Sequence, residues 1–96
     1  MVTNDMKKEF RAIIQGRVQL VMYRDFAVRT GRRLDIAGTA RNLPDGTVEI
    51  IAQGKPEELT TYVEKLRRGP WLANVESIDV VWREPAEAIK DFSILY

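Results

Sequence analysis

Apolar and polar residues alternate in the first part of the chain, and this period of two is typical of a strand with one buried face. Phe10, Ala12 and Ile14 fall on the apolar side of the pattern, and Arg11 falls on the polar side. The alternation stops at Gly16, a residue type that commonly ends or bends a strand. The pattern therefore predicts a first strand that ends at this glycine.

Two later segments have the features of α-helices. The first covers residues 22–33, which hold no proline, and Asp25 lies in its first turn, where a carboxylate complements the helix dipole. The second begins at Pro56, which suits the first helical position although no good N-cap side chain precedes it, and ends before Gly69. Its apolar stripe has the helical spacing and consists of Leu59, Tyr62, Val63 and Leu66.

Three further signals complete the predicted fold. A Pro-Asp-Gly turn at residues 44–46 joins residues 36–43 to residues 48–52, which predicts a hairpin. Residues 75–82 alternate as a fourth strand, and the apolar tail 92–96 predicts an edge strand that returns to the sheet. The order β-α-β-β-α-β with a terminal strand predicts an α+β, ferredoxin-like split βαβ sandwich. In this fold two helices cover one face of an antiparallel sheet.

The composition limits the chemistry that this chain can perform. Its 96 residues predict a single domain, 1–96, with residues 1–7 as a flexible N-terminal lead. The absence of cysteine excludes disulfides, a thiolate nucleophile and iron–sulfur clusters. The absence of histidine removes the commonest general base and the commonest zinc ligand. Any catalysis must therefore rest on other polar side chains, on backbone amides or on the substrate itself.

The charged residues are balanced in number and mixed along the chain. The 15 basic and 14 acidic side chains give a net charge of +1, so no basic field marks a nucleic-acid binder. No apolar run approaches the roughly 20 residues of a membrane span, and the N-terminus has no apolar signal-peptide core. We therefore expect a cytoplasmic monomer that binds neither nucleic acid nor membranes.

Residues 16–24 join the first predicted strand to the first predicted helix. Backbone N–H groups in such a loop can converge on an anion, and the positive end of the helix dipole favours negative charge there. Arg24 falls in the first turn of the helix, and its guanidinium matches the geometry of a phosphate. A tight turn with solvated arginines explains the same residues equally well, so the segment alone leaves both interpretations open.

The same segment resembles the phosphate loop of the acylphosphatase family, whose pattern is G-x-V-Q-G-V-x-[F/M/Y]-R. The matching residues are Gly16, Val18, Gln19, Val21, Tyr23 and Arg24. A second family block, with a basic residue, an asparagine and a D-G turn, resembles residues 38–49, where the asparagine is Asn42. Further matches occur at residues 68–70, 73–75 and 92–96. The resemblance thus covers nearly the whole chain.

The resemblance implies an activity and a set of site residues. Acylphosphatases hydrolyse carboxyl-phosphate anhydrides to a carboxylate and phosphate, and we expect no metal and no cofactor. By this resemblance Arg24 binds the phosphoryl group, and Asn42 orients the attacking water, whose proton passes to a phosphate oxygen of the substrate. Without the resemblance, Asn42 beside its Pro-Asp-Gly turn would be interpreted as a turn former. The expected phosphate-binding residues are Gly16, Arg17, Val18, Gln19, Leu20, Val21 and Arg24.

Two residues depart from the family pattern. Leu20 replaces the loop glycine, and Thr39 replaces an aromatic residue after Gly38. If the loop needs a positive φ at Leu20, a leucine costs about 1–2 kcal/mol, and the loop could relax and lose a phosphate-directed amide. If the glycine serves only close approach, Leu20 merely narrows the entrance. The first case leaves an alternative function, a phosphate- or anion-binding module of the acylphosphatase type with weak or no turnover.

Two other interpretations receive less support from the residues. An RNA-binding domain of the same topology needs aromatic residues on its central strands, and residues 48–53 contain none. Trp71 and Trp82 are of a type that can stack on ligands, but a place in the core or in loop packing is more common. We therefore predict packing roles for both tryptophans and no RNA site.

Overall fold

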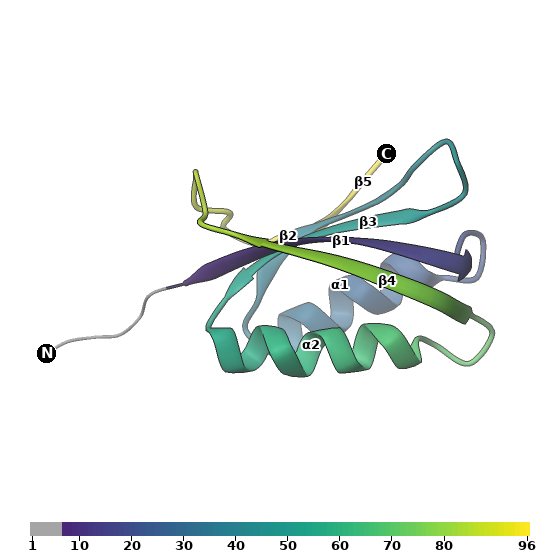
Figure 1. Ribbon diagram of the computed structural model, residues 1–96, viewed down its shortest axis with the longest axis horizontal. Helices are drawn as coiled ribbons and strands as arrows, with labels where there is room; N and C mark the ends of the chain where they lie inside the picture. Colours follow the sequence, from purple (N-terminus) through teal and green to yellow (C-terminus); the bar gives the residue numbers. More distant parts are fainter. Residues whose placement is uncertain (1–6) are drawn as a thin grey trace, which may run out of the picture.

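Helices and strands follow the predicted order along residues 7–96, the part of the chain that the computed structural model describes (Figure 1). The predicted N-terminal lead, residues 1–7, lies outside the described residues except for Lys7, which is exposed. The elements are β1 (Lys8–Arg17), α1 (Tyr23–Arg33), β2 (Ala37–Asn42), β3 (Val48–Gly54), α2 (Pro56–Arg68), β4 (Asn74–Arg83) and β5 (Phe92–Leu95).

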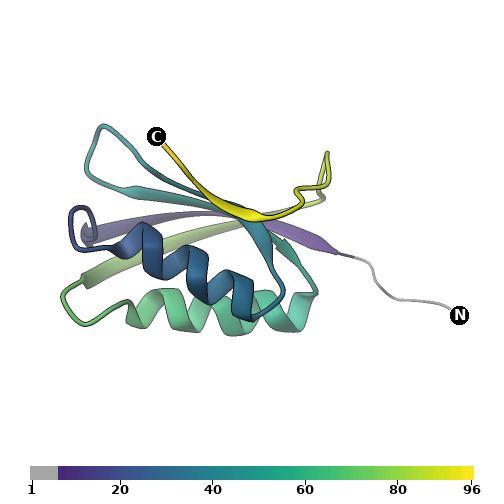
Figure 2. The same ribbon diagram turned by 180° about the vertical axis from the view of Figure 1, so that it is seen from behind.

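The strands form one five-stranded sheet in the order β4-β1-β3-β2-β5, and both helices cover the same face of it (Figures 1 and 2). This confirms the predicted ferredoxin-like arrangement. β1 pairs antiparallel with β3 and β4, and β2 pairs antiparallel with β3. β5 runs parallel to β2, so the sheet is mixed and departs from the predicted antiparallel sheet at this one pairing. The reason is that residues 84–91 carry the chain from one edge of the sheet to the other before β5 begins.

The core lies between the sheet and the two helices. The apolar side of β1 faces the helices, and Phe10 and Ile14 are fully buried there. The apolar stripe of α2 packs against this face, and the Tyr62 ring lies 6.2 Å from the Phe10 ring and 5.9 Å from the Phe92 ring. Because β5 contributes Phe92, the edge strand is part of the core and not a loose tail.

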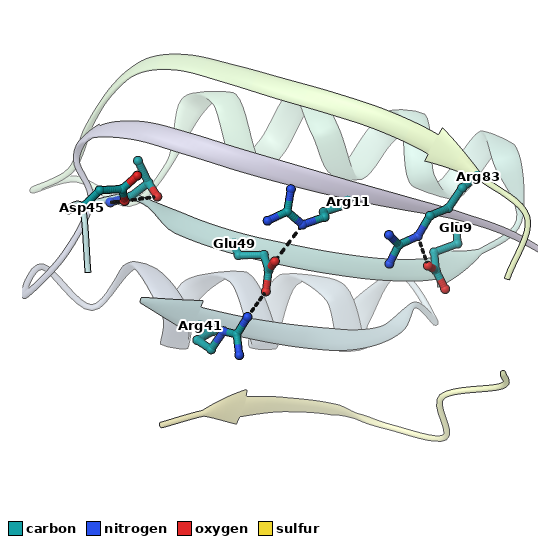
Figure 3. A network of polar contacts seen from close by, with 7 residues as sticks. Glu9, Arg11, Arg41, Asp45, Glu49 and Arg83 are labelled. Atoms are coloured by element: carbon teal, nitrogen blue, oxygen red, sulfur yellow. Dashed lines mark hydrogen bonds and ion pairs between the residues drawn. The ribbon is translucent and has the colours of Figure 1, made fainter. Parts of the chain in front are cut away.

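Ion pairs connect neighbouring strands on the opposite, outer face of the sheet (Figure 3). Glu49 on β3 accepts hydrogen bonds from Arg11 at 2.7 Å and from Arg41 at 3.0 Å. Glu9 on β1 pairs with Arg83 on β4. Both carboxylates are buried, so the arginine side chains that lie over them shield them from water.

Both helices begin without a capping side chain. α2 has Lys55 as its N-cap residue with Pro56 directly after it, as predicted. α1 begins one residue later than predicted because Met22 has φ 64° and ψ 25°, a left-handed conformation that cannot be part of a right-handed helix. Neither of the described helices is long and apolar enough to cross a membrane.

The tryptophans differ from each other in their surroundings. Trp82 is half-exposed and packs edge-on against Phe10, with 5.4 Å between ring centroids, which confirms its packing role. Trp71 is 93% exposed, so its predicted packing role is wrong. It lies in the short α2–β4 connection, outside the helix and sheet layers that bury Tyr62 and Phe92.

The carboxyl ends of three strands meet at one end of the sheet. β1 and β2 are both antiparallel to β3 and therefore run in the same direction, and β5 is parallel to β2. The β1–α1 loop, residues 18–22, leaves β1 at this end. It therefore lies beside Asn42, the last residue of β2.

Candidate active site

One cleft opens at this end of the sheet, between the β1–α1 loop, the first turn of α1, and the ends of β2 and β5. Its volume is about 370 Å³, within the range of pockets that hold small organic ligands. The lining combines a guanidinium, a carboxamide and a carboxylate with apolar side chains. The lining residues are Val18, Leu20, Met22, Tyr23, Arg24, Asp25, Asn42, Ile94 and Tyr96.

A smaller cavity of about 210 Å³ lies between the two helices. Arg33, Lys65 and Arg68 line it together with apolar side chains. Neither the β1–α1 loop nor Asn42 reaches this cavity. The residues singled out by the sequence therefore point to the first cleft as the candidate active site.

The β1–α1 loop takes a left-handed backbone at two residues that are not glycine. Leu20 has φ 62° and Met22 has φ 64°. Positive φ at Leu20 answers the question left by the sequence, because the loop does require this conformation at the position of the family glycine. Leucine takes it at a cost of about 1–2 kcal/mol, and its side chain, which is 98% exposed, also lines the entrance.

The start of α1 is directed at the cleft. Its N-cap residue, Met22, makes no side-chain hydrogen bond to the helix, so the N–H groups of the first turn have no capping side chain. Tyr23, Arg24 and Asp25 belong to this turn, and all three line the cleft. Uncapped N–H groups and the positive end of the helix dipole together favour an anion there.

Gln19 ties the loop to the β2–β3 hairpin. Its Nε2 atom donates to the carbonyl oxygens of Leu43 and Thr47, both at 2.9 Å. The hairpin itself is closed by a hydrogen bond from the Leu43 N–H to the Thr47 carbonyl, also at 2.9 Å. Gln19 thus holds the loop next to the residue that follows Asn42.

Arg24 carries the positive charge of the cleft. Its guanidinium carbon lies 5.1 Å from the centroid of the Tyr96 ring, and Nη1 donates a long, 3.5 Å hydrogen bond to the Leu95 carbonyl. The neighbouring carboxylate, Asp25, forms an ion pair with Arg29 at 2.9 Å. Within residues 7–96 no carboxylate forms an ion pair with Arg24, so its charge is available to an anionic ligand.

Asn42 supplies a second group to the cleft, a hydrogen-bond acceptor that has no donor. Its Oδ1 atom is buried, and no donor within the described residues reaches it. Burying an acceptor in this way costs about 1–3 kcal/mol, which a donor in the cleft would recover. A water or a ligand hydroxyl can supply that donor, and a carboxamide can also donate in return.

Tyr23 supports the floor of the cleft and not its chemistry. Its hydroxyl donates to the Leu66 carbonyl of α2 at 2.6 Å, and the side chain is buried. Burial raises the pKa of this hydroxyl well above its usual range. The phenol therefore stays neutral and fixed in place at ordinary pH.

The structure brings together half of the residues expected to bind phosphate or to catalyse. Val18, Leu20, Arg24 and Asn42 line the cleft, whereas the other expected residues are absent from the lining among the described residues. The residues outside the lining are Gly16, Arg17, Gln19 and Val21.

Gly16 has a different reason to be glycine. Its φ is 129°, and a Cβ atom there would lie 2.1 Å from the carbonyl oxygen of Asn74 on β4. Glycine at this position therefore allows β1 to bend and stay paired with β4, where the register shifts between Gln15 and Gly16.

Five lining residues are not among those expected to bind phosphate or to catalyse: Met22, Tyr23, Asp25, Ile94 and Tyr96. The sequence pattern places Met22 in the helix, and no local signal marks a left-handed methionine. It places Ile94 and Tyr96 in an edge strand. Its parallel pairing with β2, which sets Ile94 opposite Ala40, is what brings them to the cleft.

Comparison with known proteins identifies the family of this chain. The acylphosphatase family model matches residues 10–94. The chain belongs to the acylphosphatase family. It is 45% identical over 83 residues to an acylphosphatase of Thermus thermophilus, a match that covers 86% of this chain and 93% of that protein. It is 41% identical over 88 residues to an acylphosphatase of Salinibacter ruber, with 92% and 93% covered.

Solved acylphosphatases share the fold. The crystal structure of an acylphosphatase from Bacillus subtilis has a TM-score of 0.90 and 35% identity, covering 93% of this chain and 99% of that one. The chain is thus an acylphosphatase, a hydrolase acting on acyl phosphates, as the sequence predicts. Within residues 7–96 no group of three or more acidic side chains is arranged to hold a metal ion.

Proposed function

We propose that this acylphosphatase binds the phosphoryl group of its substrate between Arg24 and the amides of the β1–α1 loop and α1, and that Asn42 orients the attacking water. The observation that carries the proposal is that one cleft contains both a guanidinium without a carboxylate partner and a buried acceptor without a donor. Arg24 has no carboxylate partner among the described residues, and the buried Oδ1 of Asn42 has no donor. An acyl phosphate with a nearby water supplies an anion to the first and a donor to the second.

The proposed reaction breaks the bond between phosphorus and the acyl oxygen. Water oxygen attacks phosphorus, and the electron pair of the broken bond leaves with the acyl oxygen as a carboxylate. The proton of the water passes to a non-bridging oxygen of the phosphoryl group, so no protein base is needed. Arg24 and the loop amides stabilise the charge on the equatorial oxygens, which is the main contribution a protein makes to phosphoryl transfer.

The conformation of Leu20 bears on the alternative of an anion-binding module with little turnover. That alternative requires the loop to relax away from the shape that a glycine would allow. Leu20 instead keeps the left-handed conformation, with φ 62°, and the loop remains anchored to the hairpin by Gln19. Both observations support the active enzyme over the binding module.

Hydrolysis of benzoyl phosphate by the parent and by Asn42→Ala tests the proposal. We expect kcat to fall about 100-fold or more, because water orientation acts on the chemical step, with competitive inhibition by inorganic phosphate retained. Asn74→Ala, which removes an exposed asparagine at the start of β4, is the matched control. Equal rates for the parent and Asn42→Ala would show that Asn42 does not position the water. Absence of turnover in the parent, with phosphate still bound, would favour the binding module.

The proposal also includes a monomeric enzyme in the cytoplasm that acts without a metal. The monomer is tested by light scattering of the purified protein. Because we propose that no metal takes part, excess EDTA should leave turnover unchanged.

A further inference from the structure

We propose that Leu20, Met22 and Tyr96 form an acyl-binding rim that makes this enzyme prefer acyl phosphates with uncharged, apolar acyl groups over acetyl phosphate. The proposal deepens the proposed function and rests on it, because it assigns the part of the cleft that phosphate does not fill. All three side chains line the cleft that contains Arg24 and Asn42.

The rim is exposed to solvent although it is apolar. Leu20 and Tyr96 are each 98% exposed, and Met22 is 68% exposed. A single exposed apolar side chain is ordinary, but these three surround one opening. These side chains add nothing to the core. In the proposed complex the acyl group of the substrate buries them.

Two of these side chains belong to residues whose backbone conformation is strained. Leu20 and Met22 both have positive φ, which asparagine or glycine adopts with less strain. Folding of the loop therefore gains nothing from an apolar side chain at either position. A gain on substrate binding would explain residues of this type there.

The chemistry of the substrate places its acyl group at this opening. The phosphoryl and acyl groups share one oxygen, so an acyl phosphate held at Arg24 extends its acyl group toward the mouth of the cleft. A volume of about 370 Å³ is enough for a small organic ligand and not only for a phosphoryl group. Apolar surface buried between the acyl chain and the rim strengthens binding in proportion to its area.

A charged acyl group is less suited to the same site. Asp25 also lines the cleft, but its carboxylate is already paired with Arg29 at 2.9 Å and offers no attraction to a second carboxylate on the acyl chain. Arg24, the cationic group of the lining, is engaged with the phosphoryl group in the proposed complex. The lining thus favours acyl groups that are both apolar and uncharged.

The ratio of kcat/KM for hexanoyl phosphate to kcat/KM for acetyl phosphate tests the proposal. We expect a ratio of about 10 or more in the parent, since each buried methylene contributes several-fold to binding. In the double variant Leu20→Asn, Met22→Gln the ratio should fall toward one. Asparagine tolerates positive φ and glutamine has the length of methionine, so this variant removes the apolar character without adding strain. Leu72→Asn changes an exposed leucine outside the cleft lining and should keep the parental ratio.

The outcomes distinguish failure of the rim proposal from failure of the proposed function. A parental ratio near one, with acetyl phosphate hydrolysed in a manner that depends on Asn42, would overturn the rim alone. A double variant that loses activity equally toward both substrates would also overturn it, because a structural role affects both alike. A parent that hydrolyses neither substrate would overturn the proposed function, and the rim with it.

Discussion

Arg24 is the residue on which the electrostatics of the cleft depend. It lies in the first turn of α1, where the dipole already favours an anion, and the ring of Tyr96 and the carbonyl of Leu95 hold its side chain from the side of β5. A guanidinium offers two parallel donors to a phosphoryl group, which an ammonium cannot do. The charge and the geometry of Arg24 are therefore separable by mutation.

Arg24→Ala should lower kcat/KM for benzoyl phosphate by about 1,000-fold and abolish inhibition by phosphate, because both charge and donors are lost. Arg24→Lys should recover part of the phosphate affinity and little of kcat, since lysine restores only the charge. Steady-state kinetics with phosphate as inhibitor measures both effects. Arg67→Ala, an exposed arginine of α2, controls for net charge. Full activity in Arg24→Lys would contradict a role for the bidentate geometry.

At the scale of single residues the sequence predicted Arg24 and Asn42 through the loop pattern and the resemblance. It did not predict Met22, because a left-handed non-glycine residue has no local signature. It assigned Gly16 to phosphate binding, whereas the structure explains this glycine by the close approach of Asn74. Such a contact depends on pairing with a strand far along the chain and cannot be read locally.

Gln19 links two elements, the β1–α1 loop and the β2–β3 hairpin. Gln19→Glu should weaken both hydrogen bonds at once, because a carboxylate cannot donate to the carbonyls of Leu43 and Thr47. We expect the free energy of unfolding to drop by about 1–3 kcal/mol. We also expect kcat to drop about 10-fold, because Asn42 is no longer held in position beside the loop. Urea denaturation and steady-state kinetics measure the two. Gln15→Glu makes the same exchange at an exposed position of β1 and should leave both unchanged.

Tyr23 links α1 to the end of α2, and its ionisation makes that link sensitive to pH. Burial raises the pKa of this hydroxyl in the folded state, so its contribution to stability is complete below the unfolded pKa of about 10 and is lost as pH rises above it. Tyr62 adds to the effect, because burial and the nearby Tyr23 raise its pKa too.

We expect unfolding free energy to fall above pH 10 by up to about 1.4 kcal/mol per pH unit for each of these tyrosines. Tyr23→Phe should lower stability by about 1 kcal/mol at pH 7, through loss of the hydrogen bond to Leu66, and should reduce the alkaline slope. Urea denaturation between pH 7 and pH 12 gives both numbers. Identical slopes in parent and variant would show that Tyr23 ionises equally well in the folded state.

At the scale of elements, local chemistry predicted most of the fold. The Pro-Asp-Gly turn and the Pro56 to Gly69 limits of α2 act over a few residues, so they appear directly in the sequence. The parallel pairing of β5 with β2 does not, because it depends on where a long connection leads the chain. The same pairing brings Ile94 and Tyr96 to the cleft, so the sequence, which predicts the edge strand but not its partner, does not predict these two site residues.

At the scale of the whole molecule, the two faces of the sheet are stabilised in different ways. Helices bury the inner face, whereas the outer face carries buried carboxylates with arginines lying over them (Figure 3). Glu49 is central to this layer because it joins Arg11 of β1 to Arg41 of β2 across β3. Losing its charge would disturb three strands together.

Glu49→Gln should lower unfolding free energy by about 1–3 kcal/mol, since a neutral amide satisfies the two arginines less well. The loss should shrink in 1 M NaCl, because salt screens the charges in the parent. Glu84→Gln is the control, as Glu84 is 78% exposed in its pair with Lys8 and should change stability by less than about 0.5 kcal/mol. Equal losses in the two variants would mean that burial of Glu49 is unimportant.

The place of β1 between β4 and β3 also has a kinetic consequence. Phe10 is paired with Ala52 on one side and with Trp82 on the other, so no hairpin between neighbours in sequence includes β1. β1 can join the sheet only after long loops have closed, and their entropy is lost before most of its contacts are made. Refolding should therefore take on the order of milliseconds to seconds, slower than a helical bundle of this length. The enzyme's first strand therefore finds both of its partners far along the chain, in β3 and β4.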